Sequence, residues 1–115
     1  MPAYEQVWKS ITGVPGENFA NKRYTFVNLD SSEKLVTASA GEIAIGVIQE
    51  PNNVGEPAQV VVHGVSFVQL GGTVAAGAEV EVGADGTAVA LATGKAVGIC
   101  VVGGGAGDIG SVLLK

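Results

Sequence analysis

The chain has 115 residues, which favours one domain with a single core and no room for a cleft between two lobes. A hydrophobic content of 47% excludes ordinary disorder, and a net charge of −5 opposes binding to the phosphate backbone of nucleic acid. The apolar runs fall far short of the roughly 20 residues of a membrane helix, and the 18 glycines favour turns, so we expect a soluble, β-rich chain without a membrane or nucleic-acid partner.

Residues 1–18 form an expected N-terminal arm that ends at the break Gly13 to Gly16. Its large apolar side chains have a spacing that fits one face of a short helix: Tyr4, Val7, Trp8 and Ile11. Two interpretations stay open. The segment packs as a helix or arm on its own domain, or it docks on a partner, because terminal segments become ordered readily on a binding surface.

Residues 19–115 form the expected β-rich domain. Apolar runs bounded by turn residues predict strands over 24–27, 34–38, 60–68, 79–82 and 88–92, with a kink or break of the third run at Gly64. The alternation of Glu79 to Val82 predicts one buried face and one wet acidic face. Asp85 and Gly86 predict the turn of a hairpin, because this pair adopts positive φ readily.

An internal repeat dominates the second part of the chain. Residues 44–62 match residues 96–114 without a gap, and the preceding segments also correspond, so the duplication covers most of 33–114. Each copy is an apolar run, a turn-rich insert and a second apolar run, which indicates two short strands joined by a loop. The expected fold is therefore mainly β: a small single-domain β-barrel or β-sandwich with an internal duplication and an N-terminal arm or short helix.

Two patterns suggest a cofactor site or a catalytic pair, but the surrounding sequence lacks the other parts that such sites need. Gly105, Gly107 and Gly110 match the dinucleotide pattern GxGxxG, but too few residues follow them for the helix and the further βαβ unit that such a site needs. His63 and Cys100 are the single histidine and the single cysteine, and both lie in apolar strand runs. A nucleophilic pair would need a third orienting group, and zinc would need more ligands, so we expect strand and core positions instead.

The carboxylates Asp30, Asp85 and Asp108 lie in expected turns, where Asp is common for backbone reasons, with a weak cation site as the alternative. No catalytic, cofactor or metal constellation emerges, and we expect a protein that is not an enzyme. The lone cysteine excludes an internal disulfide, and the first ten residues lack the pattern of a signal peptide, so synthesis and retention or assembly in a cytoplasm are expected. The thin core, rich in Ala and Val, suggests that copies of the chain cover part of its apolar surface.

The repeated region resembles the bacteriophage capsid decoration, or cement, proteins. The features that carry this resemblance lie between Leu35 and Leu114, and they are Gly46 and Val47, Gly55 to Pro57, Gly71 to Gly77, and Gly94 to Gly98. The resemblance implies a structural virion protein, commonly a homotrimer, that binds the outer surface of an assembled head and bridges subunits of the major capsid protein. It also suggests Tyr4, Val7, Trp8 and Ile11 as capsid contacts. Other structural phage components, such as a head or tail fibre domain, and a small ligand-binding β-barrel module are the alternatives.

Overall fold

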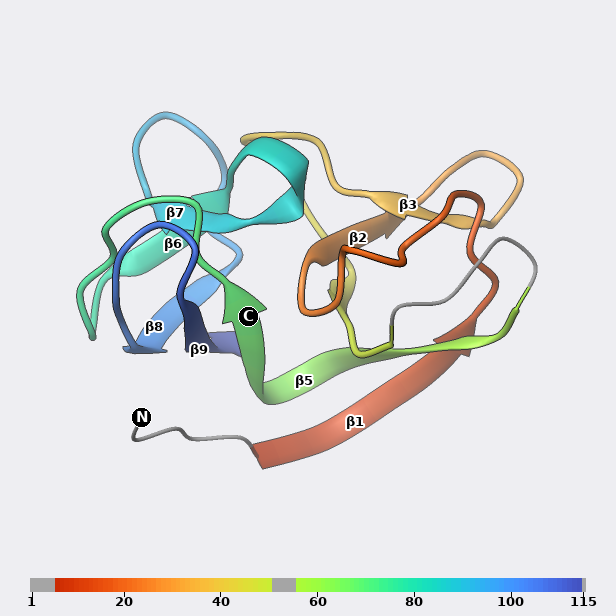
Figure 1. Ribbon diagram of the computed structural model, residues 1–115, viewed down its shortest axis with the longest axis horizontal. Helices are drawn as coiled ribbons and strands as arrows, with labels where there is room; N and C mark the ends of the chain where they lie inside the picture. Colours follow the sequence, from red (N-terminus) through yellow and green to blue (C-terminus); the bar gives the residue numbers. More distant parts are fainter. Residues whose placement is uncertain (1–5, 51–55, 115) are drawn as a thin grey trace.

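A computed structural model describes residues 6–50 and 56–114, with side chains from Lys9 onward. Within these ranges the chain forms one antiparallel sheet (Figure 1). Its strands are β1 (Gln6–Gly13), β2 (Phe26–Leu29), β3 (Leu35–Thr37), β4 (Gly46–Ile48), β5 (Ala58–Gln69), β6 (Glu79–Val82), β7 (Ala88–Ala90), β8 (Gly98–Val102) and β9 (Ile109–Leu114), with a short 3-10 turn η1 (Ala84–Gly86). The sheet curls into a half-barrel, which confirms the prediction of a small, mainly β domain.

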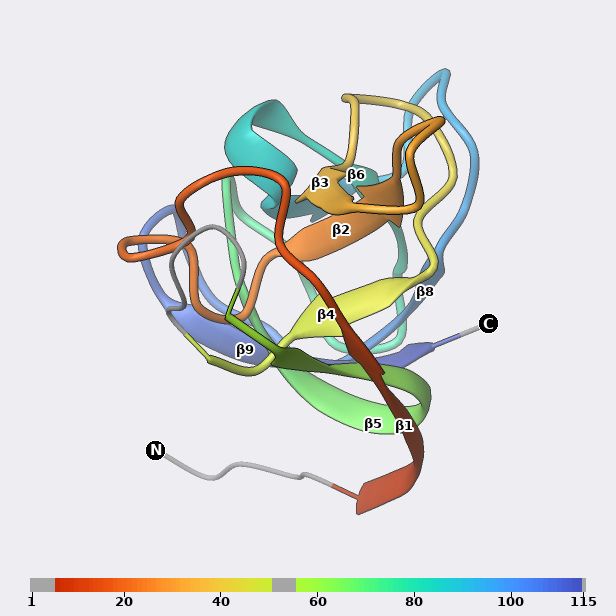
Figure 2. The same cartoon turned by 90° about the vertical axis from the view of Figure 1, so that its right-hand side faces the viewer.

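Strand β5 joins the two halves of the sheet, whose order is β3-β2-β4-β5-β9-β8-β6-β7 with β1 also beside β5. Val60 pairs with both Ile11 of β1 and Ile48 of β4, whereas Val65 pairs with Gln6 of β1 and Leu113 of β9. Because a strand has two edges, β4 and β9 follow one another along one edge and β1 runs along the other. Figure 2 shows β1 and β5 as a pair at the base of the curled sheet. The chain passes Gly64 at φ 104 without leaving the strand.

The two copies of the repeat pair their strands in the same way. The first copy and β2, which precedes residue 33, form one set of strands: β2 pairs with β3 and with β4, and β4 pairs with β5. In the second copy β6 pairs with β7 and with β8, and β8 pairs with β9. Gly46 and Gly98 occupy equivalent positions, where a Cβ would collide with the carbonyl oxygen of Val61 and of Leu113 respectively. Both copies therefore need glycine at the first residue of β4 and of β8.

The first two residues of β2 and all three residues of β4 are buried, so both faces of the sheet are covered there. Phe26 and Val47 face the inside of the half-barrel, where they join the larger core with side chains such as Val80 and Val112. Val27 and Ile48, the next residue in each strand, belong to a second cluster beneath Phe19 and Leu35. Full burial of such side chains contributes roughly 1.5–3 kcal/mol each. The segment that precedes β2 thus closes the outer side of the first copy.

Of the two forms expected for the N-terminal segment, an arm or a short helix, the described residues form an extended arm, the strand β1, and the helix is wrong there. Its backbone pairs with β5 from Val65 to Ala58, and the register shifts on either side of Lys9. A short isolated helix is marginal in water, whereas the long free edge of β5 satisfies the backbone groups of an extended segment. Tertiary pairing therefore overrides the helical spacing.

The prediction of a wet acidic face on β6 is also wrong at Glu81, which is only 8% exposed. One oxygen of its carboxylate accepts hydrogen bonds from the backbone N–H groups of Ala92 and Gly94. The Glu81 side chain thus anchors the loop between β7 and β8. The predicted hairpin turn is confirmed, with φ 56 at Asp85 and φ 75 at Gly86 between the antiparallel strands β6 and β7.

Candidate functional site

The strand β1 forms a ribbon with β5, and its described side chains, from Lys9 to Thr12, lie at the surface. Lys9, Ser10, Ile11 and Thr12 are all exposed, and Ile11 is 44% exposed. The Gln59 side-chain amide donates a hydrogen bond to Ser10 Oγ at 3.2 Å, so polar contacts also hold the two strands together. In the described part of the chain β1 pairs with β5 alone. Its other edge can accept an added strand from a partner.

The four capsid contacts suggested by the sequence fall unevenly on this ribbon. Tyr4 lies outside the described residues. Val7 and Trp8 are residues of β1. Val7 pairs with Gly64 of β5, and Trp8 lies at the first register shift between the two strands. Ile11 pairs with Val60 and exposes its side chain. The structure therefore places Val7, Trp8 and Ile11 on one strand, and their role as capsid contacts stays a prediction.

A second exposed surface, which we name the outer row, crosses three strands. Val65 of β5 pairs with Leu113 of β9, and Leu113 pairs with Ile99 of β8. Leu113 and Ile99 are each 37% exposed, whereas their neighbours Val112 and Cys100 are buried in the core. No local pattern in the sequence marks this surface, because GICVV of β8 and IGSVLL of β9 do not alternate between apolar and polar residues. The row is an apolar strip on the outside of the sheet.

His63 and Cys100 do not form a pair. Cys100 is buried in the larger core, and this burial raises the pKa of its thiol. His63 is exposed on β5 opposite Lys9. A buried thiol with a raised pKa is a poor nucleophile at neutral pH. The arrangement therefore fits the strand and core positions expected for both residues.

The turn carboxylates bind backbone N–H groups of their own turns. Asp30 Oδ1 accepts hydrogen bonds from Ser32 N at 2.8 Å and Lys34 N at 3.0 Å. Asp108 Oδ2 accepts one from Gly105 N at 2.8 Å, in the glycine-rich connection between β8 and β9. Among the described residues, no three acidic, histidine or cysteine side chains gather as a group that could hold a metal ion. The carboxylates Asp30 and Asp108 thus stabilise turns.

The glycine-rich connection passes directly from one strand to the next. Gly107 has φ 88 at its tip, and β9 follows from Ile109. A dinucleotide site would have a phosphate-binding helix at this point, and the chain forms a tight turn instead.

In the ranges 6–50 and 56–114, no helix is long and apolar enough to span a bilayer.

Comparison with known proteins gives a likeness of fold. No family model matches the chain, and no curated protein is significantly similar to it. Among solved structures, the N base of the head fiber protein gp8.5 of bacteriophage phi29 superposes with a TM-score of 0.78. The match covers 93% of this chain and 93% of that one at 19% sequence identity. The two chains therefore share the fold over nearly their whole length.

Proposed function

We propose that this chain is a structural component of a bacteriophage head, which sits on the outer surface of the shell and binds the major capsid protein. The observation that carries the proposal is the likeness of fold to a head fiber base over 93% of both chains. The decoration-protein motifs of the repeat support the same class of protein independently, because they come from the sequence and not from the superposition.

In this proposal the protein works by binding and not by catalysis. The ribbon of β1 and β5 offers an open strand edge to the shell, and the exposed Ile11 side chain adds apolar contact. Copies of the chain associate, as a homotrimer in the resembling family, through the apolar outer row. A trimer that touches several capsid subunits gains by multivalency, since each contact raises the effective concentration of the next.

Two forms of this function remain, and both have support. The motifs favour a cement protein that bridges capsid subunits and stabilises the head, whereas the phi29 likeness favours the base of a head fibre. Heating heads with and without saturating protein separates them. A cement protein raises the temperature at which the heads break open, while a fibre base binds and leaves that temperature unchanged.

Co-sedimentation with undecorated heads of the phage that encodes the chain tests the proposed class directly. We expect saturable binding, with a fixed number of copies per capsid subunit. Protein that stays in the supernatant at every concentration, while its circular dichroism confirms a folded sheet, would overturn the proposal.

Deletion of residues 1–13 tests the role of the ribbon. The side chains from Lys9 to Thr12 are exposed, so we expect the two cores to remain folded and head binding to fall at least tenfold. Replacing Lys9 and Thr12 by Ala is the control, because it keeps the strand edge and Ile11. Undiminished binding after the deletion would remove β1 from the contact surface.

A further inference from the structure

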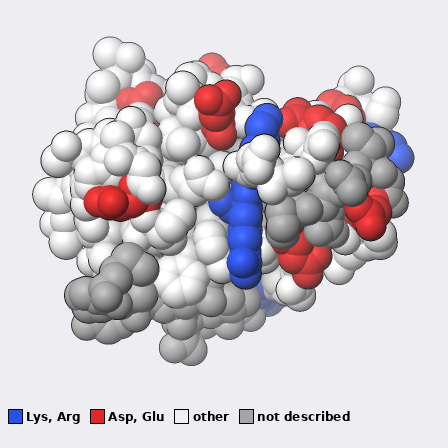
Figure 3. Space-filling model, viewed as in Figure 1, with Lys and Arg blue, Asp and Glu red and all other residues white. Residues whose placement is uncertain are grey.

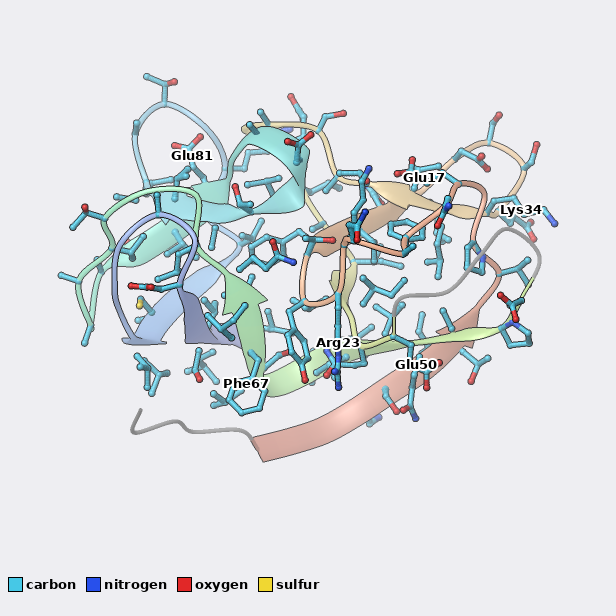
Figure 4. All side chains as sticks on the ribbon, in the orientation of Figure 1. Glu17, Arg23, Lys34, Glu50, Phe67 and Glu81 are labelled. Atoms are coloured by element: carbon cyan, nitrogen blue, oxygen red, sulfur yellow. The ribbon has the colours of Figure 1, made fainter. Side chains whose placement is uncertain are left out.

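A cluster of one cation and two aromatic rings lies where β2 begins and β5 ends. The guanidinium carbon of Arg23 lies 4.6 Å from the centre of the Tyr24 ring. The Tyr24 ring meets the Phe67 ring edge to face, with 5.5 Å between their centres. Figure 4 shows the side chains of Arg23 and Phe67 close to one another on the same side of the molecule. Arginine and tyrosine are enriched among the residues that dominate binding energy at protein interfaces.

The backbone holds this cluster in one place. Tyr24 has φ 64, a conformation that a bulky residue adopts only when its surroundings enforce it. Its N–H donates to Ile48 O at 2.8 Å, and its carbonyl accepts from Gln69 N at 2.8 Å. The strain at Tyr24 is thus balanced by bonds to the ends of β4 and β5.

Arg23 is fixed by a further two hydrogen bonds. Its Nε donates to Gln49 O at 3.0 Å, and its carbonyl accepts from the Gln69 side-chain amide at 2.6 Å. The Nε bond uses one of the five guanidinium N–H groups. A side chain that is ordered before binding loses little entropy when a partner arrives, so the exposed Arg23 is prepared for recognition.

The charge around the cluster points to the chemistry of the partner. The chain has a net charge of −5, and Lys22, the neighbouring cation, is already paired with Glu17 at 2.8 Å. Figure 3 shows most of the visible basic atoms as a short stripe in the middle of this view, with acidic groups on either side and a separate basic patch at the right-hand edge. An acidic partner is therefore repelled by most of the surface and attracted at Arg23.

We infer that the cluster of Arg23, Tyr24 and Phe67 docks an exposed carboxylate of the capsid subunit, with an apolar side chain of that subunit resting on the two rings. This inference rests on the proposed function and names the contact that the shell makes with this face. A planar guanidinium recognises a carboxylate through paired N–H bonds, and the rings exclude water from the contact.

The test compares charge reversals at two exposed cations in co-sedimentation with undecorated heads. Arg23→Glu is expected to weaken binding about thirtyfold or more, the effect of losing a dominant interface residue. Lys34→Glu, the control, makes the same change in net charge at the far end of the molecule (Figure 4) and is expected to bind like the wild type. Arg23→Lys keeps the charge without the planar fork and should fall between them. Circular dichroism and urea unfolding check that each variant is folded.

Each outcome decides between the two claims. Equal binding of folded Arg23→Glu and Lys34→Glu, when the wild type binds, would overturn the docking inference and leave the proposed function standing. A wild type that does not bind heads would overturn both. If Arg23→Glu instead breaks an oligomer of this chain in light scattering while head binding per copy is kept, the cluster contacts a second copy and the inference is wrong.

Discussion

Two buried serines, Ser66 and Ser111, lie on neighbouring strands with opposite hydrogen-bonding status. Ser66 Oγ accepts from the Gln49 side-chain amide and donates to Phe67 O, both at 3.0 Å. Ser111 is 0% exposed, and in the described part of the chain its hydroxyl is the one buried side-chain polar group without a partner. A buried hydroxyl costs free energy when unpaired and contributes little net when paired. The two serines therefore provide a matched experiment.

We predict that Ser111→Ala leaves the free energy of unfolding unchanged or raises it by up to about 1 kcal/mol, because it removes an unsatisfied group. Ser66→Ala should lower it by about 1–2 kcal/mol, since it leaves the Gln49 amide without this acceptor. Urea unfolding at pH 7 measures both. A loss of stability in Ser111→Ala equal to that in Ser66→Ala would mean that the Ser111 hydroxyl has a partner in solution.

Glu17 makes stability depend on pH in the acid range. Burial raises the pKa of its carboxyl, but hydrogen bonds from Lys22 and Thr37 favour the charged form more strongly, so the pKa lies below its usual 4.5. A group with a lowered folded pKa contributes stability above its unfolded pKa, and this contribution disappears as the pH falls through the folded pKa. Glu17 therefore supports the contact between the segment before β2 and the strand β3 at neutral pH.

We predict that Glu17→Gln lowers the urea midpoint at pH 7 and leaves a smaller difference from the wild type at pH 3. The control is Glu42→Gln, whose partner Lys95 lies 3.1 Å away in a pair with both side chains more than half exposed. An exposed pair contributes little, so this variant should match the wild type at both pH values. A constant gap between Glu17→Gln and the wild type across this range would contradict the assignment.

At the scale of elements, each copy of the repeat requires a glycine at the same position, Gly46 in β4 and Gly98 in β8. A Cβ at Gly46 or Gly98 would collide with a backbone carbonyl of the next strand, and that carbonyl cannot move without disturbing the sheet. We predict that Gly46→Ala and Gly98→Ala each lower the free energy of unfolding by about 2 kcal/mol, as for overpacking in a core. Gly72→Ala is the control, because its nearest neighbour, Val89 Cγ1, would lie 3.9 Å from the new Cβ. Urea unfolding of the three variants checks the equivalence of the copies, and a tolerated Gly98→Ala would break it.

Strands with a local signature could be predicted from the sequence, and those that depend on distant partners could not. The alternation of Glu79 to Val82 gave the bounds of β6, and the pair Asp85 and Gly86 gave its turn. The strand expected from Tyr24 begins at Phe26, because Tyr24 is held in a left-handed conformation by β4 and β5.

The candidate surfaces also depend on contacts between residues that are distant in the sequence. The helical spacing of Val7, Trp8 and Ile11 is overridden by the edge of β5, and the described side chains of this segment, from Lys9 to Thr12, lie at the surface. The outer row needs three strands from two copies of the repeat to be side by side. Arg23, Tyr24 and Phe67 meet only because β5 returns past the start of β2. No local pattern encodes such juxtapositions.

For the whole molecule, the two proposed kinds of contact should respond to salt in opposite ways. Each copy carries −5 charges, so association between copies has to overcome repulsion and relies on apolar surface. Salt screens that repulsion and favours self-association. Docking through Arg23 is an attraction between opposite charges, which salt weakens. Measuring both as a function of salt concentration separates them without any substitution.

The outer row is the surface that we expect self-association to cover. Ile99 and Leu113 lie opposite each other on β8 and β9, each 37% exposed. Elsewhere in the described residues, the exposed strand side chains Ile11 and Leu29 pair with the buried Val60 and Leu35 instead. We predict that Ile99→Ser combined with Leu113→Ser gives a folded monomer in light scattering at concentrations where the wild type is oligomeric. Leu29→Ser is the control, because Leu29 is 45% exposed on β2 and lies outside the row. If an oligomeric double variant keeps the mass of the wild type, the copies associate through another surface. If the wild type is itself a monomer, the outer row is free to contact the shell. The gain from multivalency then comes from neighbouring binding sites on the shell lattice.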